Sequence, residues 1–290
     1  MEQSIDEWVN EPSSGEREFR RAVRIILKAI SLDEELSENM VMKGGILLGI
    51  KYRSGRYTTD IDFSTSGKLG GVDIEEFKDN LNDRLLEAQV SLVEDIKCIV
   101  QSIKIQPKKR PDATFPSLKI SIGYARKKDE AKMRRLENLQ SPQTVSIDYS
   151  FNEVTGETED LEVDKEDGEK IKAYALISLI AEKIRSILQQ AERNRNRRQD
   201  IYDLHHLISN YADHTDEEKT LVLETLIQKS SGKGVDHLLH KDGLDDQEVM
   251  SRSEKDYPLL ANEISGELPD FSSTYSLVRD YYRSLPWEIA

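Results

Sequence analysis

Apolar and polar residues follow two different periods in the first half of the chain. Apolar residues recur every three to four positions over residues 15–37 and over residues 73–90, which predicts two amphipathic helices. Apolar and polar residues alternate in four shorter segments, which predicts half-buried strands in TTDIDFS, IVQSIKIQ, SLKISIGYA and TVSIDYSF. The apolar run MVMKGG predicts a further buried strand that ends in a tight glycine turn, and ILLGIKYR after it is apolar enough to begin a helix.

The second half of the chain changes character after a highly charged segment. This segment, EVTGETEDLEVDKEDGE, is expected to be a connector. From about Lys170 onward, helices are predicted in KIKAYALISLIAEKIRSILQQAE, QDIYDLHHLISNYA, EEKTLVLETLIQKS and SSTYSLVRDYYRSL. We therefore predict an α+β chain, with a flexible tail over residues 1–14, a mixed-sheet domain with flanking helices over 15–155 and a helical domain over 156–290. A functional site is expected in a cleft between the two domains.

Length and composition limit the classes of protein to which the chain can belong. Its 290 residues allow one large domain or two modest ones, each with its own core. No stretch approaches the ~20 apolar residues that cross a bilayer, and the acidic N-terminus lacks the apolar run of a secretory signal. Cys98 is the only cysteine, which excludes an intramolecular disulfide and fits a reducing compartment. We therefore expect a cytoplasmic protein without a membrane partner.

Charge is distributed unevenly along the chain. The net charge of −14 taken alone argues against a nucleic-acid partner. Between Lys97 and Arg135, however, twelve Lys or Arg residues stand against three acids, and residues 193–198 contain four arginines and no acid. One face of the protein could therefore meet a polyanion while the rest stays acidic. The simpler alternative is that both segments are solvated faces of helices and strands.

Asp60 and Asp62 are the strongest candidates for chemistry. Residues two apart on a strand point to the same face, so both carboxylates lie side by side while Ile61 and Phe63 point into the core. Two like charges at that separation repel each other, and a hard divalent cation with oxygen ligands offsets the repulsion. The simpler alternative is an exposed strand whose polar face happens to carry two acids.

Asp148 is a third acid that a neighbouring strand could bring beside this pair. In TVSIDYS it lies on the polar face of the predicted strand, between two serines. Three carboxylates that converge on two metal ions suit in-line nucleotidyl transfer, because one ion activates the attacking oxygen and the other stabilises the leaving pyrophosphate. An isolated surface acid is the alternative, and the two interpretations have equal weight.

Glycines and a later group of charged residues accompany the acids. Gly44 and Gly45 follow an apolar strand, where glycine lets backbone N–H groups approach a phosphate, although an ordinary turn has the same sequence. Lys183 would act on a triphosphate as a point charge, unless its amphipathic helix simply exposes it to water. Asp200 and Asp203 are one helical turn apart, and the simpler role of Asp200 is favourable negative charge at the start of its helix.

Two longer stretches that contain these residues resemble a known family. KGGILLGIKYRSGRYTTDIDFS is similar to the first two motifs of the AbiEii/AbiGii toxin family, roughly F-K-G-G-[ST]-x-L and R-x-S-x-D-h-D-h, where h is apolar. LIAEKIRSILQQAERNRNRRQDIYDL resembles its later motifs, a lysine on a helix and an R-D-h-Y-D-L segment. Order and spacing agree over about residues 20–210. The family has a polymerase-β-like nucleotidyltransferase fold. Its known members are toxins of toxin–antitoxin or phage abortive-infection systems, and some add nucleotides to tRNA 3′ ends.

The resemblance implies a role for each matching residue. It makes Asp60 and Asp62 catalytic ligands of Mg²⁺ or Mn²⁺, and the general fold adds Asp148 as a third catalytic and metal-binding acid. Lys183 becomes a catalytic contact to the nucleotide phosphates, and Asp200, or its neighbour Asp203, becomes the late catalytic acid. The nucleotide-binding residues that the first motifs imply are Lys43, Gly44, Gly45 and Arg56.

The activity that the resemblance implies is metal-dependent transfer of NMP from an NTP to an acceptor hydroxyl. The expected acceptor is an RNA 3′ end such as that of tRNA, and the expected protein partner is a cognate antitoxin. Ile46 stands where the family usually has Ser or Thr, whose hydroxyl would contact a phosphate. One alternative is therefore a catalytically weak or inactive nucleotide-binding module with a regulatory role. Another alternative keeps the enzyme but transfers the nucleotide to a protein or a small molecule.

An RNA acceptor would need a basic track that leads to the acids. The strands that carry Lys104 and Lys119 are expected in the same sheet as Asp60, with a loop of three basic residues, Lys108, Lys109 and Arg110, at the edge of that sheet. The second candidate is the arginine run formed by Arg193, Arg195, Arg197 and Arg198. We predict that the loop and the arginine run flank one cleft that contains Asp60 and Asp62.

Overall fold

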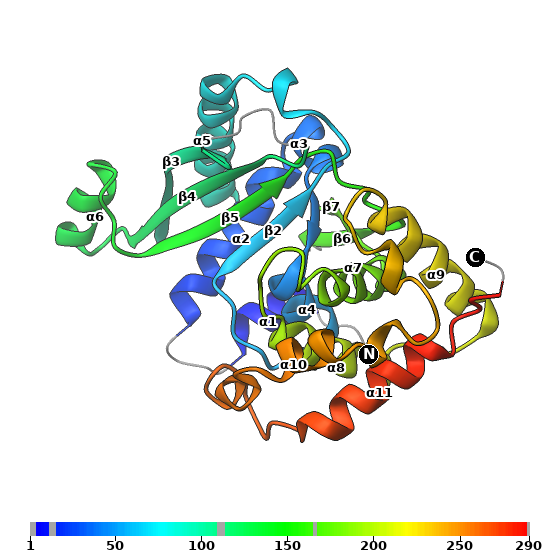
Figure 1. Cartoon of the computed structure of the whole chain (residues 1–290). Helices are drawn as coiled ribbons and strands as arrows, with labels where there is room; N and C mark the ends of the chain where they lie inside the picture. Colours follow the sequence, from blue (N-terminus) through cyan, green and yellow to red (C-terminus); the bar gives the residue numbers. More distant parts are fainter. Residues whose placement is uncertain (1–3, 12–15, 109–113, 165–166, 289–290) are drawn as a thin grey trace. The chain divides into compact units, whose positions relative to one another are not determined.

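The computed structural model of the chain describes residues 4–11, 16–108, 114–164 and 167–288 (Figure 1). The chain divides into two compact units. Unit 1 comprises Met1–Arg53, Thr58–Glu153 and Glu159–Ala173, and unit 2 comprises Ser54–Tyr57, Val154–Thr158 and Tyr174–Ala290. The sequence predicted one boundary near residue 155, whereas the chain passes between the units at several points.

A seven-stranded mixed sheet, in the order β3-β4-β5-β2-β1-β7-β6, forms the centre of unit 1 (Figure 1). Strand β2 pairs in parallel with β5 and antiparallel with β1, and β4 pairs antiparallel with both β3 and β5. The strands are β1 (Val41–Lys43), β2 (Asp60–Ser64), β3 (Ile96–Gln106), β4 (Ser117–Arg126), β5 (Thr144–Ser150), β6 (Thr158–Asp164) and β7 (Glu169–Tyr174). The five strands β1–β5 occupy the segments where the sequence predicted strands.

Strands β6 and β7 replace the predicted charged connector and the first residues of the helix predicted from Lys170. Buried Leu161 and Val163 alternate with charged residues in β6, and buried Ile171 and Ala173 alternate with polar residues in β7. The connector prediction was wrong because the acidic composition hid this period of two. Charged residues also suit β6 because it is an edge strand, where charge discourages pairing with another chain.

Helices α2 and α5 of unit 1 cover one face of the sheet. Helices α2 and α5 pack against each other, and both contact the sheet, α2 through β3 and β5 and α5 through β3. Beneath them, Ile61, Phe63 and Ile147 are fully buried. The helices are α1 (Ile5–Asn10), α2 (Arg17–Ser31), α3 (Glu34–Asn39), α4 (Gly44–Tyr52), α5 (Ile74–Ser91) and α6 (Glu130–Glu137), with a 3₁₀ turn η1 (Leu69–Gly71). The residues that alternate with the buried ones therefore form an opposite, polar face.

Two helical predictions for unit 1 change in detail. The single helix predicted over residues 15–37 is two helices, because Asp33 ends the first pattern and its side chain accepts a hydrogen bond from the backbone N–H of Leu36 at the start of α3. The predicted tail over residues 1–14 contains α1, in which Ile5 and Trp8 are buried. A tail of mixed polarity can still form a short helix when two apolar side chains find a core.

A buried lysine ties the β6–β7 hairpin to the rest of unit 1. Lys28 on α2 is fully buried, and its Nζ lies within 2.7–2.9 Å of carboxylates of Asp164, Asp167 and Glu169. Burial would lower the pKa of the Lys28 ammonium, but the three carboxylates outweigh burial and raise the pKa. The charged segment is therefore held in place by a counter-ion 136 residues away in the chain.

Unit 2 is helical. The four predicted helices are present as α7 (Leu176–Leu188), α8 (Arg198–Asn210), α9 (Asp216–Ser230) and α11 (Phe271–Arg283), and α7 packs against α8 and α9. The pattern did not predict the short polar helix α10 (Gln247–Glu254) or the 3₁₀ turns η2 (Asp236–Leu238), η3 (Gly243–Asp245) and η4 (Tyr257–Asn262). Over the described ranges, no helix has both the length and the apolar character needed to cross a membrane.

Candidate active site

Asp60 and Asp62 lie on the polar face of β2, as the alternation predicted. Ile61 and Phe63 are fully buried on the other face, whereas Asp60 is exposed and Asp62 is half-buried. The strand therefore presents two carboxylates to solvent and anchors them with the apolar residues between them. This placement supports the metal-site hypothesis but equally describes a strand with a polar face, so the neighbouring strands decide between the two.

The parallel neighbour β5 places Asp148 beside Asp62, because the two residues are register partners. Asp148 is half-buried, and its Oδ1 atom is buried without a hydrogen-bond partner among the described residues. An ionised oxygen without a partner is costly to bury, since its lost hydration is not replaced. Asp148 is therefore not an isolated surface acid but the third carboxylate on this face.

The three carboxylates fit a divalent ion in chemistry and in backbone register. All their donor atoms are oxygens, which Mg²⁺ and Mn²⁺ prefer, and the orphan oxygen of Asp148 is the kind of atom that such an ion satisfies. The side chains do not form a closed ligand set: in the described part of the chain, no three His, Cys, Asp or Glu residues gather closely enough to hold a metal. If such an ion binds at this face, Asp60, Asp62 and Asp148 are the residues that would hold it, and their side chains would have to converge on the ion.

Helix α4 starts directly against this face. The expected glycine turn does not exist as a separate element, because β1 ends at Lys43 and α4 begins at Gly44. Gly44 has a φ of +77°, and a Cβ atom there would lie 2.0 Å from Oδ2 of Asp62. Only glycine fits this position, both in conformation and in space. The backbone at the start of a nine-residue helix, with Lys43 as the register partner of Asp62, thus borders the acids.

Ile46, which departs from the family motif, is a core residue. It lies on α4 and is 2% exposed. A hydroxyl at this position would be inside the protein rather than at the polar face. The structure therefore gives Ile46 a packing role, and its presence removes little from the surface that a nucleotide would touch.

The basic segment from Lys97 to Arg135 contributes to the same sheet. Lys104 on β3 and Lys119 on β4 are both exposed and are register partners, which confirms that their strands join the sheet of Asp60. Strand β3 is an edge strand, and Lys108 follows it and is exposed. Lys109 and Arg110 lie outside the described residues. The basic loop thus begins at an edge of the sheet, as predicted.

The remaining predicted residues form a buried ion cluster in unit 2. Lys183 on α7 lies 2.6 Å from Oδ2 of Asp203 and 3.0 Å from Oδ1 of Asp200, both on α8. Arg56 donates two hydrogen bonds to the Asp203 carboxylate, from Nε and from Nη2, each 2.9 Å long. The cluster has two positive and two negative charges, and it joins residues 147 positions apart in the chain.

Electrostatics within the cluster keep Asp203 and Lys183 charged. Burial would raise the pKa of Asp203, but the positive charges of Arg56 and Lys183 outweigh it and lower the pKa to about 2. Burial would lower the pKa of Lys183, but the negative charges of Asp203 and Asp200 hold it above its usual value. The helix does not expose Lys183 to water, which rules out the simpler alternative for this residue.

Asp200 and Asp203 have different surroundings within this cluster. Both oxygens of Asp203 accept hydrogen bonds, and its side chain is fully buried. Oδ2 of Asp200 has no hydrogen-bond partner among the described residues and lies 3.8 Å from Nε of Arg197. Asp200 also lies in the first turn of α8, where negative charge is favourable. Both oxygens of Asp203 are therefore hydrogen-bonded within the protein, whereas one buried oxygen of Asp200 is not.

The arginine run has mixed surroundings. Arg193 and Arg195 are exposed, whereas Arg198 donates to Glu263 at 2.7 Å and Arg197 lies beside Asp200. Arg197 and Arg198 are therefore already engaged with acids of unit 2. That the run and the basic loop flank one cleft with Asp60 and Asp62 stays a prediction, as does a site shared by the acids of unit 1 and the ion cluster of unit 2.

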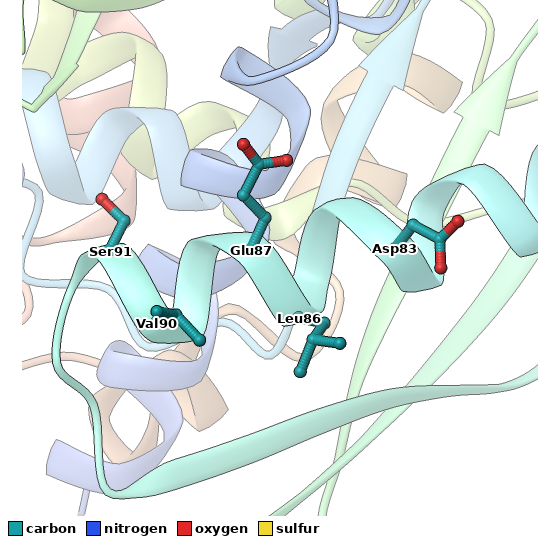
Figure 2. Close-up of a pocket in the computed structure, with 5 residues that line it drawn as sticks. All are labelled: Asp83, Leu86, Glu87, Val90 and Ser91. Carbon is teal, nitrogen blue, oxygen red and sulfur yellow. The ribbon is translucent and has the colours of Figure 1, made fainter.

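One hollow in the described surface lies beside α5, with a volume of about 530 Å³, and is lined by Asp83, Leu86, Glu87, Val90 and Ser91 (Figure 2). Two of its five lining side chains are aliphatic, and none of the five is a predicted site residue. The sheet register and the charged groups define the candidate site.

The sequence did not reveal the ion pair between Arg56 and Asp203. Arg56 belongs to the segment just before β2, and nothing in its neighbourhood indicates a partner on a helix of the second half of the chain. The only signals in the sequence were the opposite charges of Arg56 and Asp203 and their place in motifs of the same family.

Two solved structures share this fold. One is a Helicobacter pylori protein assigned as a nucleotidyltransferase, with a TM-score of 0.51 and 17% identity over 94% of this chain and 95% of that chain. The other is JHP933 from Helicobacter pylori, with a TM-score of 0.52 and 16% identity over 94% of this chain and 92% of that chain. No curated protein matches the sequence. The mixed sheet with flanking helices and a helical C-terminal part is thus the fold of a nucleotidyltransferase, as predicted.

The family follows from the sequence itself. Residues 25–283 match the family described as nucleotidyl transferase AbiEii toxin, type IV toxin–antitoxin system. The match covers most of the chain, and the chain belongs to this family. The predicted resemblance is therefore confirmed, and the protein is of the nucleotidyltransferase toxin class.

Proposed function

We propose that the protein transfers NMP from an NTP to the 3′ hydroxyl of an RNA, with tRNA as the expected acceptor. The observation that carries the proposal is the row of carboxylates on β2 and β5, where Asp62 and Asp148 are register partners and Asp60 lies on the same face. Membership of a nucleotidyltransferase family supports the reaction class. The acceptor is the one that the family resemblance implies, and the metal is inferred from the oxygen ligands of the three acids.

The reaction exchanges one phosphorus–oxygen bond for another. The 3′ oxygen of the acceptor attacks the α-phosphorus, and the bond from that phosphorus to the bridging oxygen of the β-phosphate breaks. Pyrophosphate leaves with the electron pair, and the hydroxyl proton passes to a carboxylate or to solvent. A bound Mg²⁺ or Mn²⁺ would supply positive charge to the attacking and leaving oxygens, with Asp60, Asp62 and Asp148 as the residues that hold it.

Residues around the acids would orient the nucleotide. The first N–H groups of α4 have no partner earlier in the helix and favour anionic groups, and Gly44 lets a phosphate approach them. Lys43, opposite Asp62 in the register, adds a positive charge on the same face. We place the β- and γ-phosphates of the NTP on this side of the acids.

For the ion cluster of unit 2, we propose that Lys183 contacts the nucleotide phosphates and that Asp200 is the late acid. The oxygen of Asp200 without a hydrogen-bond partner supports this choice over Asp203. Arg56 and Asp203 would act as positioning residues, because their bidentate pair holds the carboxylate that fixes Lys183. In this assignment Arg56 affects the nucleotide through Lys183 rather than by direct contact.

Transfer of label from NTP to RNA tests the proposal. Purified protein is incubated with each α-labelled NTP, Mg²⁺ or Mn²⁺, and total RNA or tRNA, and the RNA is then resolved on a gel. We expect labelled RNA with the wild type and a loss of at least 100-fold in D60N, D62N and D148N. D83N is the matched control, because Asp83 is an exposed acid on α5 with no described partner. Labelling that survives in both D60N and D62N would contradict the site.

The cellular role is tested separately from the chemistry. The family supports a toxin with an antitoxin, and we propose that it acts in the cytoplasm as part of phage defence by abortive infection. Induced expression should stop growth, and D62N should relieve the arrest.

The labelling assay also tests the alternatives. Label that appears in a protein or a small molecule in place of RNA would support that class of acceptor. Calorimetric binding of NTP with Mg²⁺, without turnover on any acceptor, would support an inactive nucleotide-binding module.

A further inference from the structure

A row of charged residues crosses the polar face of unit 1 from strand to strand. Successive register partners link Lys104 on β3 to Lys119 on β4, Lys119 to Asp148 on β5, and Asp148 to Asp62 on β2. On β1, Lys43 is the register partner of Asp62 and completes the row. Register partners point to the same face, so the acids lie between one lysine on the β1 side and two lysines on the β4 and β3 side.

Small hydroxyl side chains surround this row. Ser102, Ser121 and Ser146 form the adjacent row that ends at Asp60, and Ser117 and Ser150 lie in the row on the other side. All five serines are half-buried, and none of their hydroxyls has a hydrogen-bond partner within the described ranges. Short side chains rise little above the strands, so that a long ligand can approach the backbone closely. Serine hydroxyls are also common contacts to phosphate and sugar oxygens.

Neither lysine on the β4 and β3 side is paired with an acid in the described part of the chain. Lys104 and Lys119 are exposed, and neither forms an ion pair with any described residue. Lys119 and Asp148 have opposite charges and are direct neighbours, yet they do not pair, and Oδ1 of Asp148 stays without a hydrogen bond. Both groups are therefore available to a ligand that brings phosphate to the lysine and a cation to the acid.

The two basic flanks suggest two different phosphate ligands. In an in-line displacement, the attacking oxygen and the leaving group lie on opposite sides of the phosphorus. The β1 flank has Lys43 and the start of α4, where the proposed function places the leaving pyrophosphate. The acceptor should then approach from the β4 flank. Strands are about 4.8 Å apart, which puts Lys119 about 5 Å and Lys104 about 10 Å from Asp148 along the sheet.

We propose that the polar face of β3, β4 and β5 binds the backbone of a single-stranded RNA acceptor. In this inference, which rests on the proposed function, Lys119 contacts a phosphate close to the 3′ end and Lys104 contacts one further back. The serine rows contact phosphate and sugar oxygens. The RNA strand runs across the sheet toward Asp148. The protein contacts its sugar–phosphate backbone, and such contacts carry no base preference.

Salt-dependent RNA binding tests the acceptor surface without catalysis. Labelled single-stranded RNA is titrated with the full chain by fluorescence anisotropy, with Mg²⁺ and without NTP, at several salt concentrations. The variants are K104Q, K119Q and the double variant. The control is K78Q, because Lys78 lies on α5, which packs on the opposite face of the sheet, and its only ion pair among the described residues is a 3.7 Å contact to Glu75. Far-UV circular dichroism verifies the fold of each variant.

We expect each single variant to reduce the slope of log K against log salt by about 0.7, and the double variant by about 1.4. In the labelling assay, the KM for RNA should rise at least 5-fold in the double variant, while the KM for NTP changes less than 2-fold. An unchanged salt slope in the double variant overturns the inference, regardless of the result of the labelling assay. A rise in the KM for NTP equal to that for RNA also overturns it, since the lysines would then bind the triphosphate.

The two proposals fail in different ways. If no NTP labels any RNA but K104Q and K119Q reduce the salt slope as expected, the acceptor surface stands and the proposed reaction fails. If RNA is labelled in an Asp62-dependent manner but the slope is the same in wild type and double variant, the reaction stands and the acceptor surface fails.

Discussion

A substitution at Asp203, compared with one at Asp200, tests which acid of the ion cluster stabilises the fold and which takes part in the reaction. The substitution D203N keeps the size of the side chain but removes its charge. Asp203 is fully buried and accepts hydrogen bonds from Arg56 and Lys183, so the variant leaves two buried cations with a single carboxylate, that of Asp200. Asp200 has one hydrogen bond to Lys183 and one oxygen without a partner, so D200N removes much less.

The expected loss of stability follows from the pKa and from the broken pairs. A folded pKa of about 2 against an ordinary value of 3.8 corresponds to about 2 kcal/mol of stability at neutral pH. Removing one partner from a buried ion pair typically costs about 3–5 kcal/mol, because the remaining charge is uncompensated. The pKa shift reports only the free energy of protonating Asp203 and leaves out the cost of the unpaired cations. For D203N we therefore expect a loss of about 3–5 kcal/mol. For D200N we expect no more than about 2 kcal/mol, since the amide oxygen can still accept from Lys183.

Urea unfolding followed by circular dichroism measures both variants at pH 7 and at lower pH. The folded pKa of Asp203 lies below its unfolded pKa, so the stabilisation is complete above about pH 4 and is lost as the pH falls toward 2. The difference between wild type and D203N should therefore shrink from pH 7 to pH 3. D203N as stable as wild type at pH 7 would refute this account of the cluster. Full labelling activity in D200N would refute its assignment as the late acid.

Three further substitutions test other parts of the structure. K28M should cost about 3–5 kcal/mol in urea unfolding because it leaves three carboxylates without their buried counter-ion, whereas K170M, at an exposed 3.5 Å pair, should cost less than about 1 kcal/mol. G44A should abolish labelling of RNA while G71A does not, because a Cβ at 44 would strike a carboxylate of β2 and a Cβ at 71 meets nothing within 4 Å. I46T should lower stability by about 1–3 kcal/mol without improving NTP affinity in calorimetry, since the hydroxyl would be buried; tighter NTP binding would show that position 46 reaches the nucleotide.

Local patterns in the sequence predicted most of the elements of the fold. Alternation placed β2, β4 and β5 correctly because each has one buried and one solvated face, and the helical period placed α5, α8 and α9. Patterns failed where composition masked the period, as in β6, and where elements were short and polar, as in α6 and α10. In those segments, the packing of one or two apolar residues decides the structure, and one or two residues give no readable period.

The sequence by itself also determined the chemical character of the site. Asp60 and Asp62 had to share a face because a strand has a side-chain period of two, and the order of motifs was enough to indicate the family. These properties depend on residues that follow one another along the chain, so a single sequence is enough to show them.

Only the tertiary structure decided which distant residues meet. The parallel register of β2 and β5 placed Asp148 beside Asp62 and made Lys119 its neighbour, and the fold brought Arg56 to Asp203 across 147 positions. It also buried Lys183, which the helical pattern alone allowed to face water. Strand order, register and the pairing of buried charges depend on interactions between segments far apart in the chain, and no local period of apolar and polar residues records them.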